Sequence, residues 1–169
     1  MSASASTVIL TALTRLATQW SSPQVQAQYA RSAGIRIDPG DIPTLYVLGM
    51  QGSRRAASLA DELGLTRPTM SKKLQRLEAA GFIARSPDPA DGRAATVSLS
   101  ESGEAAYDAL VARGLAATDD ALREWAPADR ALLADLIDRF VIDMGVEVPV
   151  IRRTTADAPR GARRSHKEE

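Results

Sequence analysis

Residues 67–76 carry side chains that could bind a polyanion and recognise the chemical groups along it. The segment reads RPTMSKKLQR and has four basic residues and no acidic one. Met70, Leu74 and the following Leu77 recur at helical spacing, so we expect that face of a helix to pack inward. The opposite face would then present hydroxyl, amide and cationic groups, which bond base edges and phosphates. The side chains assigned to such contacts are those of Arg67, Pro68, Thr69, Ser71, Lys72, Lys73 (nearer the packed face, for a phosphate), Gln75 and Arg76.

A charged helix face can also be only a solvated surface, and the charges alone would favour that interpretation. The stretch that follows favours nucleic acid. Residues 82–85 and 96–99 alternate as two short strands around a tip rich in proline and glycine. Arg93 at this tip could enter a minor groove, and Asp91 could hold its guanidinium by a two-pronged bond. The competing interpretation of Asp91 and Arg93 is a surface ion pair that contributes about 0–1 kcal/mol.

The elements that position these side chains have local signals. Gly64 supplies the left-handed residue that ends one helix, and Thr66 is placed to cap the next. The first of these helices would begin at Ser58, with Asp61 completing a capping box, or one turn earlier near Arg55. A helix-turn-helix followed by a charged hairpin has the shape of a winged helix that reads duplex DNA.

A family pattern extends across this whole segment. Its residues are Leu59-Ala60, Leu63-Gly64-Leu65, Arg67-Pro68-Thr69, Leu74, Arg76-Leu77-Glu78, Gly81-Phe82-Ile83-Ala84-Arg85, Pro87 to Ala94 and Val97 to Gly103. They closely resemble the MarR family of bacterial transcription regulators, whose wing signature (Asp, any residue, Arg) is matched by Asp91 and Arg93. The resemblance implies a homodimer with a recognition helix in the major groove of double-stranded DNA and the wing arginine in the minor groove. Residues 32–41 depart from the family pattern and resemble it only loosely.

Apolar residues outside this segment are spaced for further helices. An amphipathic stretch spans residues 8–20, and a long helix is expected after the hairpin, weakened at Gly114 by about 1 kcal/mol. Pro127 begins another helix with more large apolar groups than a lone surface helix needs. Packing within one chain would explain that pattern equally well. The resemblance instead implies that these helices, at about 6–31 and 101–146, join a second subunit.

We therefore expect a mainly α fold with a small β-hairpin wing, made of a winged helix-turn-helix lobe and a helical dimerisation lobe. Residues 1–151 would form a single MarR-like unit, with the winged helix-turn-helix at about 42–100. Residues 152–169 lack large apolar side chains and are expected to be a disordered tail. The formal net charge is +0, but residues 53–93 hold eight basic and five acidic groups. A near-neutral chain can therefore still direct a basic lobe toward phosphate.

Several chemistries are set aside by composition. The chain of 169 residues has no cysteine, and its single histidine, His166, lies in the expected tail. We therefore expect no metal, no cofactor and no catalytic triad, and the protein is not predicted to be an enzyme. The N-terminus lacks a basic leader and no stretch is apolar enough to span a membrane, so a cytoplasmic protein is expected.

The function expected from these residues is that of a homodimeric repressor on a pseudo-palindromic operator. Many proteins of the resembling family bind a small anionic or aromatic effector in a crevice between the two lobes. Trp20, Tyr29 and Tyr46 are predicted to line such a crevice, with ordinary core packing as the competing interpretation. The alternative function is a winged-helix module for protein–protein contact without specific DNA binding. A further alternative is that the chain is the dimerisation part of an enzyme. We expect this less, because the chain has no room for a catalytic domain.

Overall fold

A computed structural model of the chain describes residues 3–88 and 95–146. Its elements, in chain order, are α1 (Ala5–Trp20), α2 (Pro23–Ser32), the 3-10 turn η1 (Pro39–Asp41), α3 (Ile42–Gln51), β1 (Arg54–Arg55), α4 (Ala56–Glu62), α5 (Arg67–Ala79), β2 (Ile83–Pro87), β3 (Ala95–Leu99), α6 (Glu101–Ala121) and α7 (Pro127–Asp143). The expectation of a mainly helical fold with a small β wing is confirmed. Helix α4 begins at Ala56, so the earlier of its two expected start points holds and Ser58 is not its cap.

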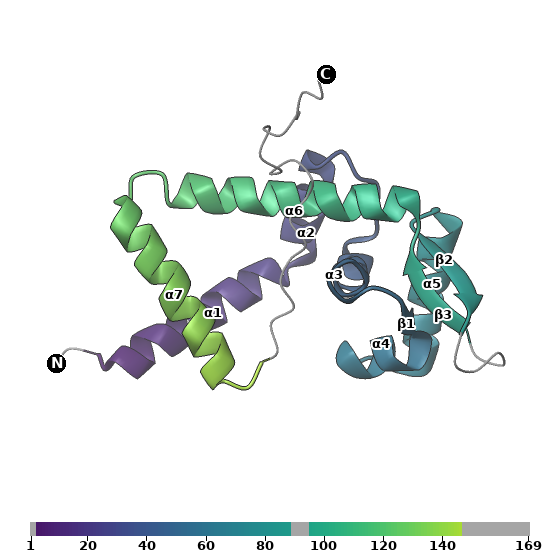
Figure 1. Cartoon of the computed structure of the whole chain (residues 1–169), viewed down its shortest axis with the longest axis horizontal. Helices are drawn as coiled ribbons and strands as arrows, with labels where there is room; N and C mark the ends of the chain where they lie inside the picture. Colours follow the sequence, from purple (N-terminus) through teal and green to yellow (C-terminus); the bar gives the residue numbers. More distant parts are fainter. Residues whose placement is uncertain (1–2, 89–94, 147–169) are drawn as a thin grey trace, which may run out of the picture.

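Helix α6 connects the two ends of the molecule (Figure 1). It is capped by Ser100, whose side-chain oxygen accepts a hydrogen bond from the backbone N–H of Gly103 at 3.0 Å. Its first half is buried through Tyr107, Leu110 and Val111, where α6 contacts α2, α3 and β3. Its second half runs toward α7 and away from the sheet. One continuous helix therefore links the part of the molecule that contains the sheet with the part that contains α7.

The sheet has three antiparallel strands in the order β1-β3-β2. Strands β2 and β3 form the expected hairpin, with Ile83 opposite Leu99 and Arg85 opposite Val97. Strand β1 is an addition that the sequence did not predict, and it pairs Arg54 with Val97 from the other side. The side chain of Val97, in the central strand β3, is fully buried. The sheet therefore fixes the base of the wing against the core.

The core lies where α3, α4, α5 and the first half of α6 meet the sheet. Gly49 permits a close approach of α6 to α3, because a Cβ there would lie 2.4 Å from the ring of Tyr107. The ring of Tyr107 also meets that of Tyr46 edge-on, with 5.9 Å between centroids. The largest fully buried apolar side chains are those of Leu45, Leu48, Leu59, Met70, Leu74, Leu77, Val97 and Leu110.

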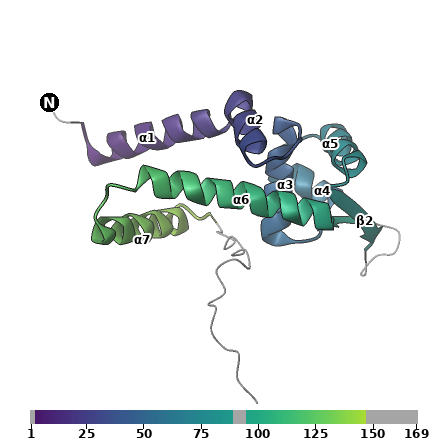
Figure 2. The ribbon, with the colours of Figure 1, turned by 90° about the horizontal axis from the view of Figure 1, so that it is seen from above.

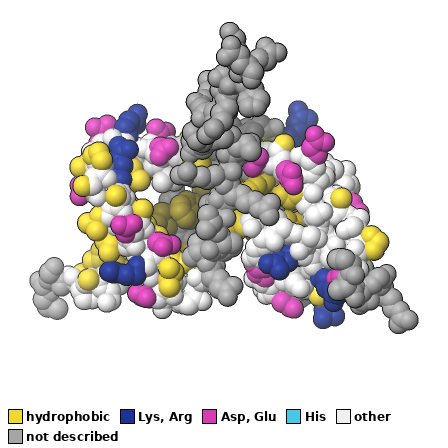
Figure 3. Space-filling view, in the orientation of Figure 1, with side chains coloured by type: hydrophobic (Ala, Val, Ile, Leu, Met, Phe, Trp, Pro, Cys, Tyr) yellow, Lys and Arg dark blue, Asp and Glu magenta, His cyan; other side chains and the backbone are white. Residues whose placement is uncertain are grey.

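Helices α1 and α7 have no buried residue in the described chain. They cross in the view of Figure 1 but lie apart in Figure 2. Apolar side chains gather on the α7 side of the molecule in Figure 3. Within residues 3–88 and 95–146, α7 therefore buries no side chain against its own chain, contrary to the alternative interpretation of its apolar pattern. The exposed large apolar side chains on α1 and α7 are those of Val8, Ile9, Leu10, Leu13, Leu16, Trp20, Leu132, Leu136, Ile137, Phe140 and Ile142.

Candidate nucleic-acid interface

Helix α5 is positioned by a short turn and by its own N-terminal cap. Gly64 has φ +62°, in the left-handed region that glycine adopts without strain. The Thr66 hydroxyl accepts a hydrogen bond from the backbone N–H of Thr69 at 3.3 Å, as predicted for the cap. Met70, Leu74 and Leu77 anchor the inner face of α5 in the core. The opposite face is thereby held toward solvent.

The outward face of α5 carries most of the side chains that the sequence assigned to DNA. Lys73 is the exception, because it lies partly buried at the edge of this face. The exposed side chains are those of Arg67, Pro68, Thr69, Ser71, Lys72, Gln75 and Arg76. The structure therefore brings these groups together on one surface. Their contact with DNA stays a prediction.

Two cations of this face are bound within the chain. The carboxylate of Asp41 accepts hydrogen bonds from Arg76 Nε at 3.0 Å and from an Arg76 terminal nitrogen at 2.7 Å. Lys73 Nζ lies 3.3 Å from the same carboxylate and also donates to the carbonyl oxygen of Gly40. We call Asp41, Lys73 and Arg76 the Asp41 cluster. Arg67 and Lys72 are not part of it.

Two ion pairs also connect the base of the wing to its neighbours. Arg55 Nε of β1 lies 2.5 Å from Asp88 Oδ2, and Asp88 is buried at the end of β2. Arg85 of β2 pairs with Glu78 of α5 at 3.0 Å. The wing residues singled out from the sequence, Asp91 and Arg93, lie outside the described residues, as does the expected tail 152–169. Their assigned roles stay predictions.

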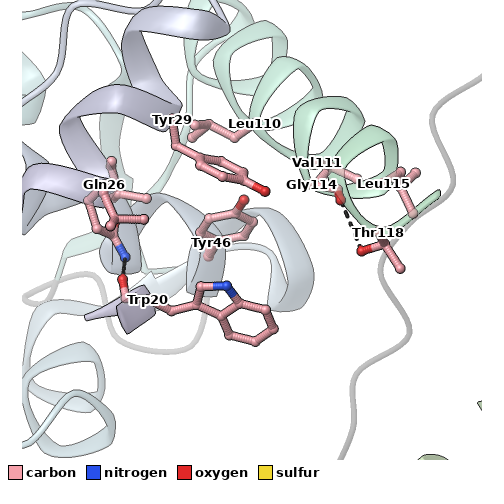
Figure 4. Close-up of a pocket in the computed structure, with 11 residues that line it drawn as sticks. Trp20, Gln26, Tyr29, Tyr46, Leu110, Val111, Gly114, Leu115 and Thr118 are labelled. Atoms are coloured by element: carbon pink, nitrogen blue, oxygen red, sulfur yellow. Dashed lines mark hydrogen bonds between the residues drawn. The ribbon is translucent and has the colours of Figure 1, made fainter. Parts of the chain in front are cut away.

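A pocket of about 370 Å³ lies between α1, α2, α3 and α6. The rings of Trp20, Tyr29 and Tyr46 face this space, with the tyrosine hydroxyls directed into it (Figure 4). The structure therefore brings together the three aromatic residues that the sequence assigned to a crevice. The other residues that line it are Val25, Gln26, Ile42, Leu110, Val111, Gly114, Leu115 and Thr118.

The pocket is aromatic and carries no formal charge. None of the described lining residues is an acid or a base with a charge at neutral pH. Burial raises the pKa of Tyr46 above its ordinary value, and the nearby Tyr29 and Tyr107 raise it further. Arg113 lies over the Tyr29 ring, 5.5 Å from its centroid, and its Nε donates a hydrogen bond to the Ser32 hydroxyl. The Tyr46 hydroxyl is therefore a neutral hydrogen-bonding group at neutral pH.

Asp41 is the residue of this region that the sequence interpretation missed. It lies in the run Asp38 to Pro43, which predicts only a break between helices. Its partners are far along the chain, and no local spacing connects Asp41 with Arg76. The remaining pocket residues were missed for the same reason, because they come from helices that only the tertiary fold brings together.

Two further findings apply to the described residues. Over residues 3–88 and 95–146, no group of three or more His, Asp or Glu side chains is placed to hold a metal ion. No helix in that part of the chain has the length and apolar character needed to cross a membrane.

Comparisons with known proteins bear on this geometry. Residues 37–94 match the model of the MarR family. The chain is 28% identical over 89 residues to the helix-turn-helix type transcriptional regulator YxaD of Bacillus subtilis, which covers 53% of this chain and 62% of that protein. It is 32% identical over 73 residues to the regulator Mb0904 of Mycobacterium bovis, over 43% of this chain and 51% of that one. The matches thus span between half and two thirds of these relatives.

The fold has a close counterpart among solved structures. A MarR family protein from Bacillus stearothermophilus superposes with a TM-score of 0.72 at 17% identity, over 85% of this chain and 99% of that chain. At this identity the likeness concerns the fold. The family match covers the helix-turn-helix and the β2 strand, and the fold match extends to the flanking helices. Residues 37–94 are therefore similar to the MarR family, and the described chain has the fold of a MarR family protein.

Proposed function

We propose that this protein is a homodimeric repressor that binds a pseudo-palindromic operator in duplex DNA. The observation that carries the proposal is the outward face of α5. It presents hydroxyl, amide and cationic groups on a helix that is capped at Thr66 and anchored by three buried side chains. A helix held in this way can enter a major groove, where such groups discriminate bases.

The dimer is supported by α1 and α7. Their exposed side chains include Leu13, Leu136 and Phe140, and neither helix has a buried residue in the described chain. Apolar surface on two helices of one protein is best covered by the same surface of a second copy. Two copies would place two α5 helices about 34 Å apart, which matches half-sites one helical turn apart. A protein that covers such a site excludes others from it, so we infer repression.

The test is selection from random duplex DNA, followed by measurement of affinity at several salt concentrations. We expect an inverted repeat and a steep loss of affinity with salt. Lys72→Ala should flatten the slope of log affinity against log salt by about 0.9 if Lys72 contacts one phosphate. Arg123→Ala is the matched control, because Arg123 is a well-exposed cation between α6 and α7. Recovery of no motif, with only weak salt-sensitive binding, would favour the protein–protein module instead.

We infer further that a small effector in the pocket releases the operator. The pocket is lined by helices of both ends of the molecule, so a bound compound could change how α5 is held relative to α6. Its lining favours an uncharged aromatic compound with a polar substituent over the anionic alternative. A carboxylate would lose its hydration there without gaining a cation, which costs several kcal/mol.

Ligand class can be tested with the protein's own fluorescence. The chain has two tryptophans, so Trp125→Phe leaves Trp20, which lines the pocket, as the reporter. Benzamide and benzoate share a shape and differ in charge. We expect saturable quenching by benzamide and binding of benzoate weaker by about tenfold or more, because of the unpaired charge. Equal affinity for the two would contradict the neutral-ligand assignment, and quenching by neither would remove support for an effector of this class.

A further inference from the structure

Asp41 is a buried carboxylate whose contacts lie outside its own helix. It is 1% exposed, at the junction of η1 and α3. Asp41 occupies the N-cap position of α3, yet its side chain makes no capping hydrogen bond. An isolated buried carboxylate is unfavourable by several kcal/mol unless it is paired. The partners of Asp41 are Lys73 and Arg76 of α5, so these ion pairs connect the start of α3 to α5.

The geometry of the Asp41 cluster is specific. Arg76 reaches the carboxylate with two nitrogens, at 3.0 and 2.7 Å, and this two-pronged arrangement fixes the orientation of both groups. The hydrogen bond to Asp41 raises the pKa of Arg76 above its ordinary value. Lys73 lies three residues earlier on the same edge of α5 and is 14% exposed at its side chain. The carboxylate of Asp38 adds a second acid, 3.9 Å from Arg76 Nε.

The Asp41 cluster divides the cations of α5 into two classes. Residues 67–76 hold four basic side chains, two of which are neutralised within the chain. Arg67 and Lys72 are left to meet phosphates. A recognition helix with four uncommitted cations would contact more phosphates and so bind any duplex more tightly. Because phosphate contacts carry no sequence information, its preference for one sequence would fall.

The same helix start also forms part of the pocket wall. Ile42 directly follows Asp41 in the chain, is 2% exposed and lines the pocket. Tyr46, one helical turn farther along α3, lines it as well. A movement of the start of α3 would therefore change the pocket and the Asp41 cluster together.

We propose that Asp41 is a positioning residue for sequence-specific DNA binding, which fixes α5 to the start of α3 and keeps Lys73 and Arg76 away from phosphates. This inference rests on the proposed function, since it assumes that the outward face of α5 meets DNA. It assigns Lys73 and Arg76 a role different from the base and phosphate contacts expected from the sequence.

The test compares the full-length wild type with Asp41→Asn, which keeps the shape of the side chain and removes its charge. We expect Asp41→Asn to bind random-sequence duplex severalfold more tightly at low salt. Its salt slope should be steeper by up to about 1.8, which corresponds to two added phosphate contacts. Its preference for the selected operator over random duplex should fall severalfold. A merely structural role would weaken both kinds of binding and leave the slope unchanged, and that result would overturn the proposal.

A second variant keeps the test decisive if Asp41→Asn does not fold. The triple variant Asp41→Asn, Lys73→Met and Arg76→Gln removes the whole Asp41 cluster and leaves no buried charge unpaired, since Asp38 is 53% exposed at its side chain. If the two cations do not touch phosphate in the wild type, its salt slope should equal that of the wild type. A slope flatter by about 0.9 or more would show that at least one of them does, and would overturn the proposal.

Amide hydrogen exchange separates this inference from the proposed function. Without DNA, exchange at residues 73–80 of Asp41→Asn should be at least severalfold faster than in the wild type, because the contact that orders this part of α5 is lost. Unchanged exchange would overturn the positioning role even if the wild type binds an operator. Faster exchange in a protein whose wild type shows no salt-dependent duplex binding would uphold the positioning of α5 and refute the proposed function alone.

Discussion

Gly103 and Gly114 lie on the same helix, and the same substitution should have opposite effects at the two positions. A Cβ at Gly103 would lie 1.9 Å from the carbonyl oxygen of Phe82, and separation to 3.0 Å requires a movement of about 1.1 Å. That oxygen also accepts a hydrogen bond from the backbone N–H of Ser100 at 3.0 Å, so it belongs to the junction between the wing and α6. Neither side of the contact is a flexible side chain.

The expected magnitude follows from two opposing terms. Overpacking that moves backbone costs about 3 kcal/mol or more, at the upper end of the usual range. Alanine in place of glycine in a helix returns about 0.5–1 kcal/mol. Gly103→Ala should therefore lower the free energy of unfolding by about 2 kcal/mol or more, which corresponds to a fall in Tm of roughly 4–8 °C for a chain of this size.

Gly114→Ala is the matched control, because nothing lies within 4 Å of a Cβ built there. It should raise the free energy of unfolding by about 0.5–1 kcal/mol. The measurement is urea unfolding followed by far-UV circular dichroism, at one chain concentration because a dimer's stability depends on it. The reasoning is refuted if Gly103→Ala unfolds within about 0.5 kcal/mol of the wild type, a change typical of an unstrained surface site.

Three further outcomes are expected. Leu136→Lys on the exposed face of α7 should shift sedimentation equilibrium toward the monomer, whereas Arg123→Ala should not; a persistent dimer would exclude that face from the interface. Leu74→Ala should lower the free energy of unfolding by about 2–5 kcal/mol, since Leu74 is fully buried, and a loss below about 1 kcal/mol would contradict its place in the core. Because the pKa of Tyr46 is raised in the folded state, its contribution to stability should be complete below the unfolded value of about 10 and decline at higher pH. Tyr46→Phe should make unfolding less sensitive to pH in that alkaline range, and an identical pH profile would rule the effect out.

The helix-turn-helix was predictable because its signals are local. Gly64, Thr66 and the apolar residues of α5 lie within four residues of the partners they need, so spacing alone indicates the turn, the cap and the inner face. The break before Pro127 and the long helix before it follow from the same kind of signal. The MarR resemblance then supplied what spacing could not, namely how these elements are combined.

The parts that could not be predicted depend on contacts between distant residues. Strand β1 has two residues, Arg54 and Arg55, which are too few to show any alternation. The contact between Asp41 and Arg76 spans 35 residues, and an aspartate after proline and glycine has the composition of an ordinary turn. The pocket aromatics were chosen through the resemblance, and the packing of three helices decides whether Trp20, Tyr29 and Tyr46 share one space.

The absence of buried residues in α1 and α7 has a consequence for dosage. In the proposed dimer, much of the apolar surface of each newly made chain is covered only after it meets a second chain. At low abundance, the amount of operator-binding species would then vary with roughly the square of the chain concentration, by mass action. A twofold fall in synthesis would reduce occupancy by more than twofold. Such a regulator would have a threshold set by its own level, before any effector acts.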